Sequence, residues 1–257
     1  MRRIFLAAAV AALSWMPAAA METAGREIVV PIVGRGPGAL GSEWRTDLVL
    51  THVARRTIEP PAVVTLTLWQ AGQAEKSVAF TLEPRGSMTL EDVLLRTFGI
   101  GEGSGMLSVS TPAVHSTVAA RARIYNVGSP AGDFGQIVNG LPLPQLALDQ
   151  LLPALSAAGG RRTNIGVTNP TAAPVSVWIS LHGPEGDQFG LSFGVIVPPR
   201  TVKRWDDIIS ASGLTLRDPV TVRVAATAPV YAFASTVSGQ SGDADFISGT
   251  AVPADEP

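Results

Sequence analysis

The chain has 257 residues, of which 46% are apolar and only 16% are charged, so it has ample material for a buried core. Its 19 Lys and Arg against 21 Asp and Glu give a net charge of −2. That balance argues against a nucleic acid or an anionic membrane as partner, because both require clustered positive charge. The absence of cysteine excludes disulfide bonds, thiolate metal sites and a cysteine nucleophile.

Residues 1–20, MRRIFLAAAVAALSWMPAAA, have the pattern of a signal peptide. Arg2 and Arg3 supply a short positive region, and the apolar run that follows is too short to span a membrane. Three alanines precede the expected cleavage after Ala20. We therefore expect an exported protein, periplasmic or extracellular, with no membrane anchor after cleavage. The arginine pair leaves open whether export uses the general or the twin-arginine route.

The rest of the chain is dominated by short β-branched segments that are interrupted by Gly, Pro, Asn and Asp. These segments predict strands at 62–69, 77–82, 106–110, 114–120, 174–181, 195–197, 220–225 and 230–236. No amphipathic helix of three turns is expected. The pattern favours an all-β sandwich over an α/β fold.

Two segments of the chain repeat each other without a gap. Residues 84–94 are PRGSMTLEDVL and residues 199–209 are PRTVKRWDDII, and shorter matches flank them in the same order. Such a repeat predicts an internal duplication. We expect two tandem immunoglobulin-like β-sandwich domains, at residues 27–142 and 151–253, joined by a Pro-rich linker at 143–150.

The repeated phrase has a predicted structural role. Its proline ends a strand, because proline cannot donate a ladder hydrogen bond. Asp92 and Asp207 are then expected to cap the first turn of a short helix, which Gly99 or Gly213 ends in a left-handed conformation. The alternative is that these acids bind cations or act as an acid–base pair, but adjacent carboxylates need not converge on one point.

An arginine lies upstream of each copy of the phrase, within RTD at 45–47 and RTN at 162–164. Because a guanidinium group suits a carboxylate, we expect an ion pair in each half. The expected pairs are Arg45 with Asp92 or Glu91, and Arg162 with Asp207 or Asp206. A separation of more than about 6 Å in both halves would contradict this expectation. The alternative is that these residues are ordinary surface charges.

Large apolar residues indicate where the interior lies. Leu90 and Trp205 occupy the same place in the repeated phrase and are expected to close one end of each sandwich. Trp69 and Trp178 are expected in the core. Trp44 either packs at the core or is exposed beside Arg45 as a recognition patch.

No constellation in the sequence has the spacing of a catalytic site. His52, His115 and His182 are not spaced as metal ligands, and Ser104 lacks the surroundings of a nucleophile elbow. The acidic loops at 132–133 and 242–245 lack the pattern of a calcium loop and are expected to be solvated turns. We therefore predict a protein that is not an enzyme, without catalytic, metal-binding or cofactor-binding residues and without a cofactor.

Several phrases resemble those of a known group of proteins. WRTDL at 44–48, RTNIGVTNP at 162–170 and VTNPTAAPVSV at 167–177 resemble uncharacterised exported bacterial proteins built from tandem immunoglobulin-like β-sandwich repeats. The resemblance covers nearly all of the chain after residue 20. It implies the immunoglobulin-like fold and a bacterial envelope setting, and it implies no functional residues.

Export, duplication and the lack of a convergent polar site favour a non-catalytic structural, adhesive or partner-binding module of the bacterial envelope or exterior. Its expected partner is another envelope protein or surface component. One alternative is a periplasmic chaperone-like protein with two immunoglobulin-like domains, which would need paired cations between the domains. Another is a hydrolase with a spatially assembled Ser/His/Asp site, which would need a histidine beside a serine and a carboxylate.

Overall fold

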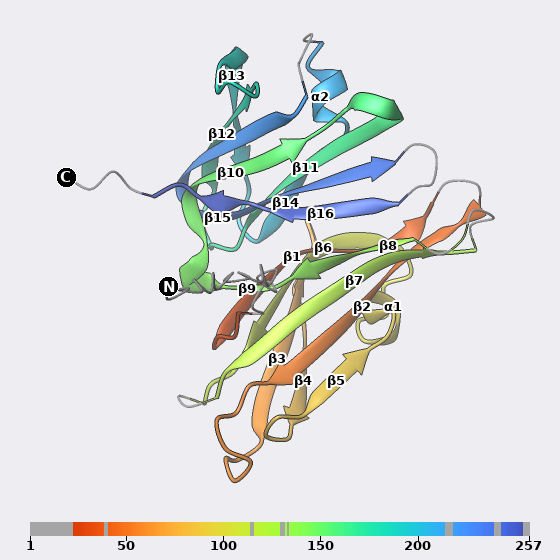
Figure 1. Cartoon of the computed structure of the whole chain (residues 1–257). Helices are drawn as coiled ribbons and strands as arrows, with labels where there is room; N and C mark the ends of the chain where they lie inside the picture. The colour runs from red at the N-terminus through yellow and green to blue at the C-terminus, as the bar shows by residue number, and fades with distance from the viewer. Residues whose placement is uncertain are drawn as a thin grey trace, which may run out of the picture.

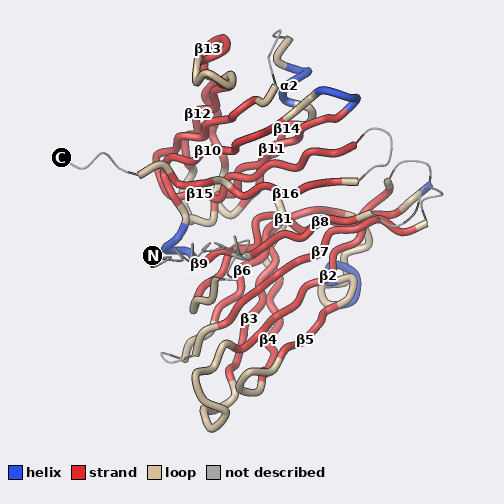
Figure 2. The backbone as a smooth tube through the Cα atoms, viewed as in Figure 1, coloured by secondary structure: helices blue, strands red, loops and turns tan. Residues whose placement is uncertain are grey.

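The computed structural model of the chain describes residues 23–38, 41–113, 116–128, 132, 134–213, 218–238 and 243–253. The expected signal peptide at 1–20 lies outside these residues, as do His115 and Asp133. Within them the strands form two antiparallel sheets, which lie one above the other in Figure 1. Figure 2 shows how little of the backbone is helical. No helix in these ranges is long and apolar enough to cross a membrane.

The first half of the chain, residues 23–142, forms a nine-stranded sheet. Its strands are β1 (Glu27–Pro37), β2 (Glu43–His52), β3 (Ala62–Trp69), β4 (Lys76–Leu82), β5 (Ser87–Leu90), β6 (Gly103–Ser110), β7 (Val118–Val127), β8 (Gly135–Asn139) and β9 (Leu141–Pro142). They fold into two layers. The β3 layer has the order β4-β3-β6-β1-β9, and the β2 layer has the order β5-β2-β7-β8. Strand β1 joins the layers through Gly36 and Pro37, which pair with β2.

The second half, residues 147–253, forms an eight-stranded sheet. Its strands are β10 (Ala147–Leu155), β11 (Arg161–Asn169), β12 (Val175–His182), β13 (Gln188–Val197), β14 (Thr201–Trp205), β15 (Val220–Ser238), β16 (Ala244–Ser248) and β17 (Thr250–Ala251). The β12 layer has the order β13-β12-β15-β10-β17, and the β11 layer has the order β14-β11-β15-β16. The 19-residue strand β15 crosses both layers, because its first part pairs with β12 and its last part with β11.

Short helical segments connect the strands. They are α1 (Val93–Arg96), α2 (Ile208–Ala211) and the 3₁₀ segments η2 (Leu143–Gln145) and η3 (Ala158–Gly160). Helix α1 follows β5 and helix α2 follows β14, so each begins with the last two residues of one copy of the repeated phrase.

The two halves share their strand pairings, residue by residue. One row crosses β4, β3, β6 and β1 through Val78, Leu66, Val109 and Ile28, and its counterpart crosses β13, β12, β15 and β10 through Phe193, Ile179, Val224 and Gln150. A second row runs through Leu90, Leu48, Ala122 and Val138, and its counterpart through Trp205, Ile165, Ala234 and Ile247. These rows define which positions of the two halves are equivalent.

Each half has an apolar interior, and the first interior extends into the second half. Tyr231 and Phe233 of β15 are buried in the same cluster as Leu48 and Leu66 of the first half. Strand β1 therefore has apolar neighbours on both faces, and its residues from Ile28 to Val33 are all buried. A strand covered on both sides needs a continuous apolar run rather than an alternating one, and the sequence of β1 has such a run.

Polar contacts accompany this packing between the halves. The Thr168 hydroxyl donates to the Pro31 carbonyl at 2.7 Å, and the Tyr231 hydroxyl donates to the Asn139 carbonyl at 2.8 Å. The ring of Phe233 lies so close to Gly166 that a Cβ atom there would be 2.1 Å from the ring. Glycine at position 166 therefore makes room for an aromatic ring at the contact between the halves.

The all-β prediction is confirmed, and the strand predicted at 62–69 coincides with β3. Of the strand predicted at 114–120, the part from Val118 onward belongs to β7, and residues 114 and 115 lie outside the described residues. The segments 220–225 and 230–236 belong to the single strand β15. Strand β10 starts at Ala147, inside the segment expected to be a linker.

The tryptophans divide between core and surface. Trp44, Trp69 and Trp205 are partly buried and pack against the apolar clusters, as expected for a core role. The prediction for Trp178 is wrong, because 46% of this residue is exposed. Its ring lies beside Gly194 of the neighbouring strand, where a Cβ atom would be 3.3 Å from the indole nitrogen.

Candidate functional site

The repeated phrase builds the same unusual backbone in both halves. Four of its residues have a positive φ, namely Arg85 (63°), Asp92 (43°), Arg200 (54°) and Asp207 (47°). Residues other than glycine rarely adopt this left-handed backbone conformation, which costs them roughly 1–2 kcal/mol each. The phrase is therefore a pair of sharp turns around a short strand.

A hydrogen bond from a distant strand supports the second turn. The Asp92 N–H donates to the Asp47 side chain at 2.8 Å, and the Asp207 N–H donates to the Asn164 side chain at 2.9 Å. The RTD and RTN sequences thus contact the repeated phrase, as expected. The contact common to both halves uses their third residue rather than their arginine.

The capping prediction is only half right. Asp92 and Asp207 occupy the N-cap positions of α1 and α2, but neither side chain caps the helix, because a left-handed residue turns its side chain away from the first turn. Gly99 and Gly213 do end the helices in the left-handed conformation, with φ of 69° and 67°. The Gly99 N–H bonds to the Leu95 carbonyl at 3.0 Å.

The arginine prediction holds in the first half and is wrong in the second. Arg45 Nε lies 3.9 Å from Asp92 Oδ2, but Arg35 Nε is closer, at 3.1 Å. Arg162 is exposed and forms no ion pair within the described chain. Arg35 could not be predicted as a partner of Asp92, because it lies in the glycine-rich stretch GRGPG, which has no strand pattern.

These contacts are part of a charged network that we call the Asp92 cluster. Its members are Arg35, Glu43, Arg45, Asp47, Asp92 and Tyr125. A hydrogen bond from Arg45 lowers the pKa of Glu43, and the same bond raises the pKa of Arg45. Burial raises the pKa of Tyr125, whose hydroxyl also donates to Asp47 at 3.1 Å. The cluster ties the start of α1 to β1, β2 and β7.

The described part of the second half has no counterpart of this network. The Thr46 hydroxyl bonds to the Gly34 carbonyl and the Thr163 hydroxyl to the Ser156 carbonyl, so Arg35 and Ala157 are equivalent. Pairing with Arg45 and Arg162 likewise makes Tyr125 equivalent to Val237. In both halves the Oδ1 atom of the aspartate, Asp92 or Asp207, is buried and has no hydrogen-bond partner among the described residues. The difference lies in Oδ2, which forms ion pairs with arginines only at Asp92 within the described chain. The two halves share a scaffold but differ in their chemistry at this end.

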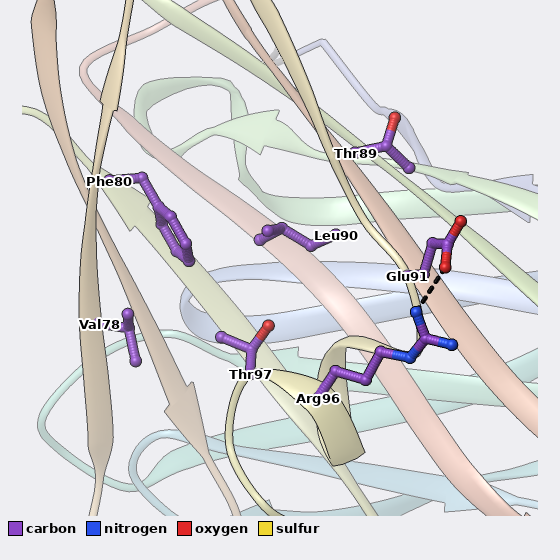
Figure 3. Close-up of a pocket in the computed structure, with 7 residues that line it drawn as sticks. All are labelled: Val78, Phe80, Thr89, Leu90, Glu91, Arg96 and Thr97. Carbon is purple, nitrogen blue, oxygen red and sulfur yellow. Dashed lines mark hydrogen bonds and ion pairs between the residues drawn. The ribbon is translucent and has the colours of Figure 1, made fainter.

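A groove opens beside the Asp92 cluster, where the two layers of the first half end (Figure 3). Its volume is about 470 Å³, and we call it the β4–β5 groove. Its lining residues are Val78, Phe80, Thr89, Leu90, Glu91, Arg96 and Thr97. The apolar side chains come from β4 and from the end of β5. An ion pair at the rim joins Arg96 Nη1 to Glu91 Oε2 at 2.6 Å.

Both strands that border the groove are sheet edges. Among the described strands, β4 pairs only with β3, and β5 pairs only with β2. Their outer backbone groups are therefore free of ladder hydrogen bonds, which is the arrangement that accepts an added strand. The sequence indicated only that Leu90 closes one end of the sandwich, and no pattern in it paired this segment with β4.

The two described histidines, His52 and His182, do not assemble a hydrolytic site. His52 is fully buried, and neither ring nitrogen has a partner among the described residues. His182 Nε2 lies 2.9 Å from the Ser180 hydroxyl, but its other nitrogen faces the Gly186 carbonyl rather than a carboxylate. Within the described chain, no group of three or more metal-ligating side chains converges.

Comparison with known proteins gives no further guide to this site. No protein-family model matches the chain, and no curated protein matches it.

Proposed function

We propose that the chain is an exported, non-catalytic module of the bacterial envelope or exterior that binds a partner protein through the β4–β5 groove. The observation that carries this proposal is the groove itself, which has an apolar floor and two free sheet edges. Edges of this kind bind extended segments through main-chain hydrogen bonds, and adjacent apolar pockets add specificity. The signal-like residues 1–20 supply the argument for export.

We also propose that the two halves are copies of one immunoglobulin-like sandwich. Support comes from the equivalent pairing rows and from the four left-handed residues at matching positions. As in immunoglobulin domains, the second strand pairs with the fifth and the third with the sixth. The first and seventh strands have exchanged places, since β1 lies beside β6 and β7 lies beside β2. The fold proposed here is thus a variant of the immunoglobulin arrangement.

The chaperone-like alternative has less support. Proteins of that class need cations free to anchor a client between two domains. In the described structure, Arg200 of the second half lies over the Trp69 ring of the first, with 4.9 Å between the guanidinium carbon and the ring centroid. This cation is engaged within the chain, where it contributes about 0.5–2 kcal/mol to the packing of the halves.

Site-specific cross-linking tests the proposed function. A photoreactive residue is placed at Thr89, on the groove rim, or at the equivalent exposed position Arg204 in the second half. After irradiation of intact cells that express the chain, we expect a partner adduct at Thr89 and none at Arg204. Mass spectrometry of the recovered chain should show an N-terminus at Met21. Equal labelling at both positions, or an uncleaved N-terminus, would count against the proposal.

A further inference from the structure

We infer that the β4–β5 groove is a receptor for an aromatic side chain, presented by an extended segment of the partner that aligns along β4. This inference rests on the proposed function and names the chemistry of the segment that binds. It comes from comparing the groove with the equivalent place in the second half.

Two equivalent positions carry aliphatic residues in the first half and aromatic rings in the second. Val78 and Phe193 occupy the same place in the first pairing row, and Leu90 and Trp205 occupy the same place in the second row. Phe193 and Trp205 contact each other edge to face, with centroids 6.1 Å apart and ring planes at 64°. At a third pair of equivalent positions the order is reversed, because Phe80 pairs with Val64 as Val195 pairs with Val177. The second half therefore has one ring more than the first at this place, the indole of Trp205 where the groove has Leu90.

The second half indicates which side chain fits the β4–β5 groove. The scaffold around the groove is the one that accommodates rings in the second half, and an edge-to-face ring pair contributes about 0.5–1.5 kcal/mol beyond its buried area. Phe80, on the floor of the groove, offers a ring to such a partner. A volume of about 470 Å³ lies within the usual range of ligand sites, which is roughly 300–1,000 Å³, so it holds an indole.

The rim of the groove has a hydrogen-bond acceptor for the polar group of an aromatic side chain. Glu91 is 64% exposed, and only one of its carboxylate oxygens is used by Arg96. The other oxygen can accept the N–H of a bound indole, which needs a partner once it is buried. Tryptophan is therefore expected to bind better than an aliphatic residue of similar size.

The free edge of β4 determines how the partner segment presents its aromatic side chain. The outer edge of β4 offers backbone groups along the whole groove, and alternate residues of this strand, Val78 and Phe80, face the groove. A segment paired with β4 would direct every second side chain toward the same side, because side chains alternate along a strand. An extended partner segment thus delivers an aromatic ring onto Phe80 without rearranging the fold.

A titration with a minimal probe tests the inference directly. N-acetyl-L-tryptophanamide is added to the ¹⁵N-labelled chain without residues 1–20, with N-acetyl-L-leucinamide as the matched control. We expect amide shifts to concentrate at 78–80 and 89–97, with a Kd on the order of 1 mM, and a Kd at least about tenfold weaker for the leucine probe. Shifts that spread over both halves, or equal binding of the two probes, would overturn the inference.

Two double variants test the groove: one fills it in the first half, and the other opens the equivalent place in the second half. Val78→Phe with Leu90→Trp installs the rings of the second half and should abolish the shifts while the rest of the spectrum is unchanged. Phe193→Val with Trp205→Leu opens the second half and should add a new set of shifts near 193–205. If the first variant binds the probe as wild type does, the groove is not the receptor, provided its spectrum is that of a folded protein.

The probe experiment and the cross-linking experiment fail independently. Tryptophanamide binding at the groove without an adduct at Thr89 would retain the receptor and reject the proposed partner protein. An adduct at Thr89 without probe binding would retain the proposed function and reject the aromatic chemistry. A concentration-dependent dimer that Leu90→Trp abolishes would identify a second copy of this chain as the occupant and would contradict a distinct partner.

Discussion

Arg35 and Asp92 form a buried ion pair: Nε of Arg35 lies 3.1 Å from Oδ2 of Asp92, and the two side chains are 13% and 7% exposed. They are 57 positions apart in the chain, and the pair joins β1 to the start of α1. It holds the rim of the β4–β5 groove in place, because Glu91 and Arg96 immediately flank this junction.

Removing the cation should destabilise the first half. Arg35→Leu leaves the Asp92 carboxylate buried with only Arg45 nearby, at 3.9 Å, and we expect a loss of about 3 kcal/mol in the free energy of unfolding. Arg162→Leu is the matched control, because this arginine is exposed, and its effect should stay within about 0.5 kcal/mol. Urea denaturation measures both. Equal effects of the two substitutions would show that the pair is energetically unimportant.

The backbone at Asp207 should prefer glycine to alanine. Its φ of 47° is strained for alanine but not for glycine, so Asp207→Gly should be more stable than Asp207→Ala by about 1 kcal/mol. Ser210, exposed within α2, should show the opposite order by about 1 kcal/mol, because glycine is a poor helix former. Thermal unfolding of the four variants compares the signs directly. The same sign at both positions would contradict the left-handed assignment.

His52 should be replaceable by an apolar residue. Both ring nitrogens are buried without a described partner, so His52→Leu should raise the free energy of unfolding by about 1 kcal/mol. The equivalent residue, Asn169, donates to three carbonyls and accepts two hydrogen bonds from Thr171. Asn169→Leu should therefore lower the free energy of unfolding by about 3 kcal/mol. The comparison is made by urea denaturation, and a destabilised His52→Leu variant would indicate hidden partners for this ring.

Gly166 should tolerate no side chain. A Cβ atom there would lie 2.1 Å from the ring of Phe233, so Gly166→Ala should cost about 1–3 kcal/mol through overpacking between the halves. Gly194→Ala is the control, because the exposed ring of Trp178 can move away from it. Adding Phe233→Leu to Gly166→Ala should recover part of the loss in a double-mutant cycle. Purely additive losses would argue against a direct contact.

Alkaline titration should show that both tyrosines of the chain have a higher pKa than free tyrosine. Burial raises the pKa of Tyr231 to about 12, and burial also raises the pKa of Tyr125. Absorbance at 295 nm should therefore change little near pH 10, the ordinary tyrosine pKa, and Tyr231→Phe should remove the later step.

The same shift makes stability depend on pH. Because the folded-state pKa of Tyr231 is raised above its unfolded value, its contribution is fully present below about pH 10 and is lost as pH rises toward about 12. The loss amounts to about 2–3 kcal/mol, and Tyr231→Phe should flatten the curve of unfolding free energy against pH. A wild-type curve that is flat between pH 9 and 11.5 would conflict with a buried phenol.

Local sequence was sufficient for much of the fold. Three features depend on neighbouring residues only and were predictable. They are the strand 62–69, the left-handed glycines at 99 and 213, and the short helices that begin at the end of the repeated phrase. The continuous apolar run of β1 lacks alternation, because both faces of this strand are covered. Its partners on the second face come from β15, about 200 residues away, so no local pattern could identify them.

The candidate site shows the same division. Residues 23–253 could be predicted to be all-β, with one turn phrase that occurs twice, because strand propensity and turn chemistry act over a few residues. Two further features depend on the folded chain. Arg35 pairs with Asp92 whereas Arg162 forms no ion pair within the described chain, and Val78 and Leu90 line a groove where the second half has Phe193 and Trp205. Those outcomes depend on which strands meet across the layers, and strand pairing is set by long-range burial rather than by adjacent residues.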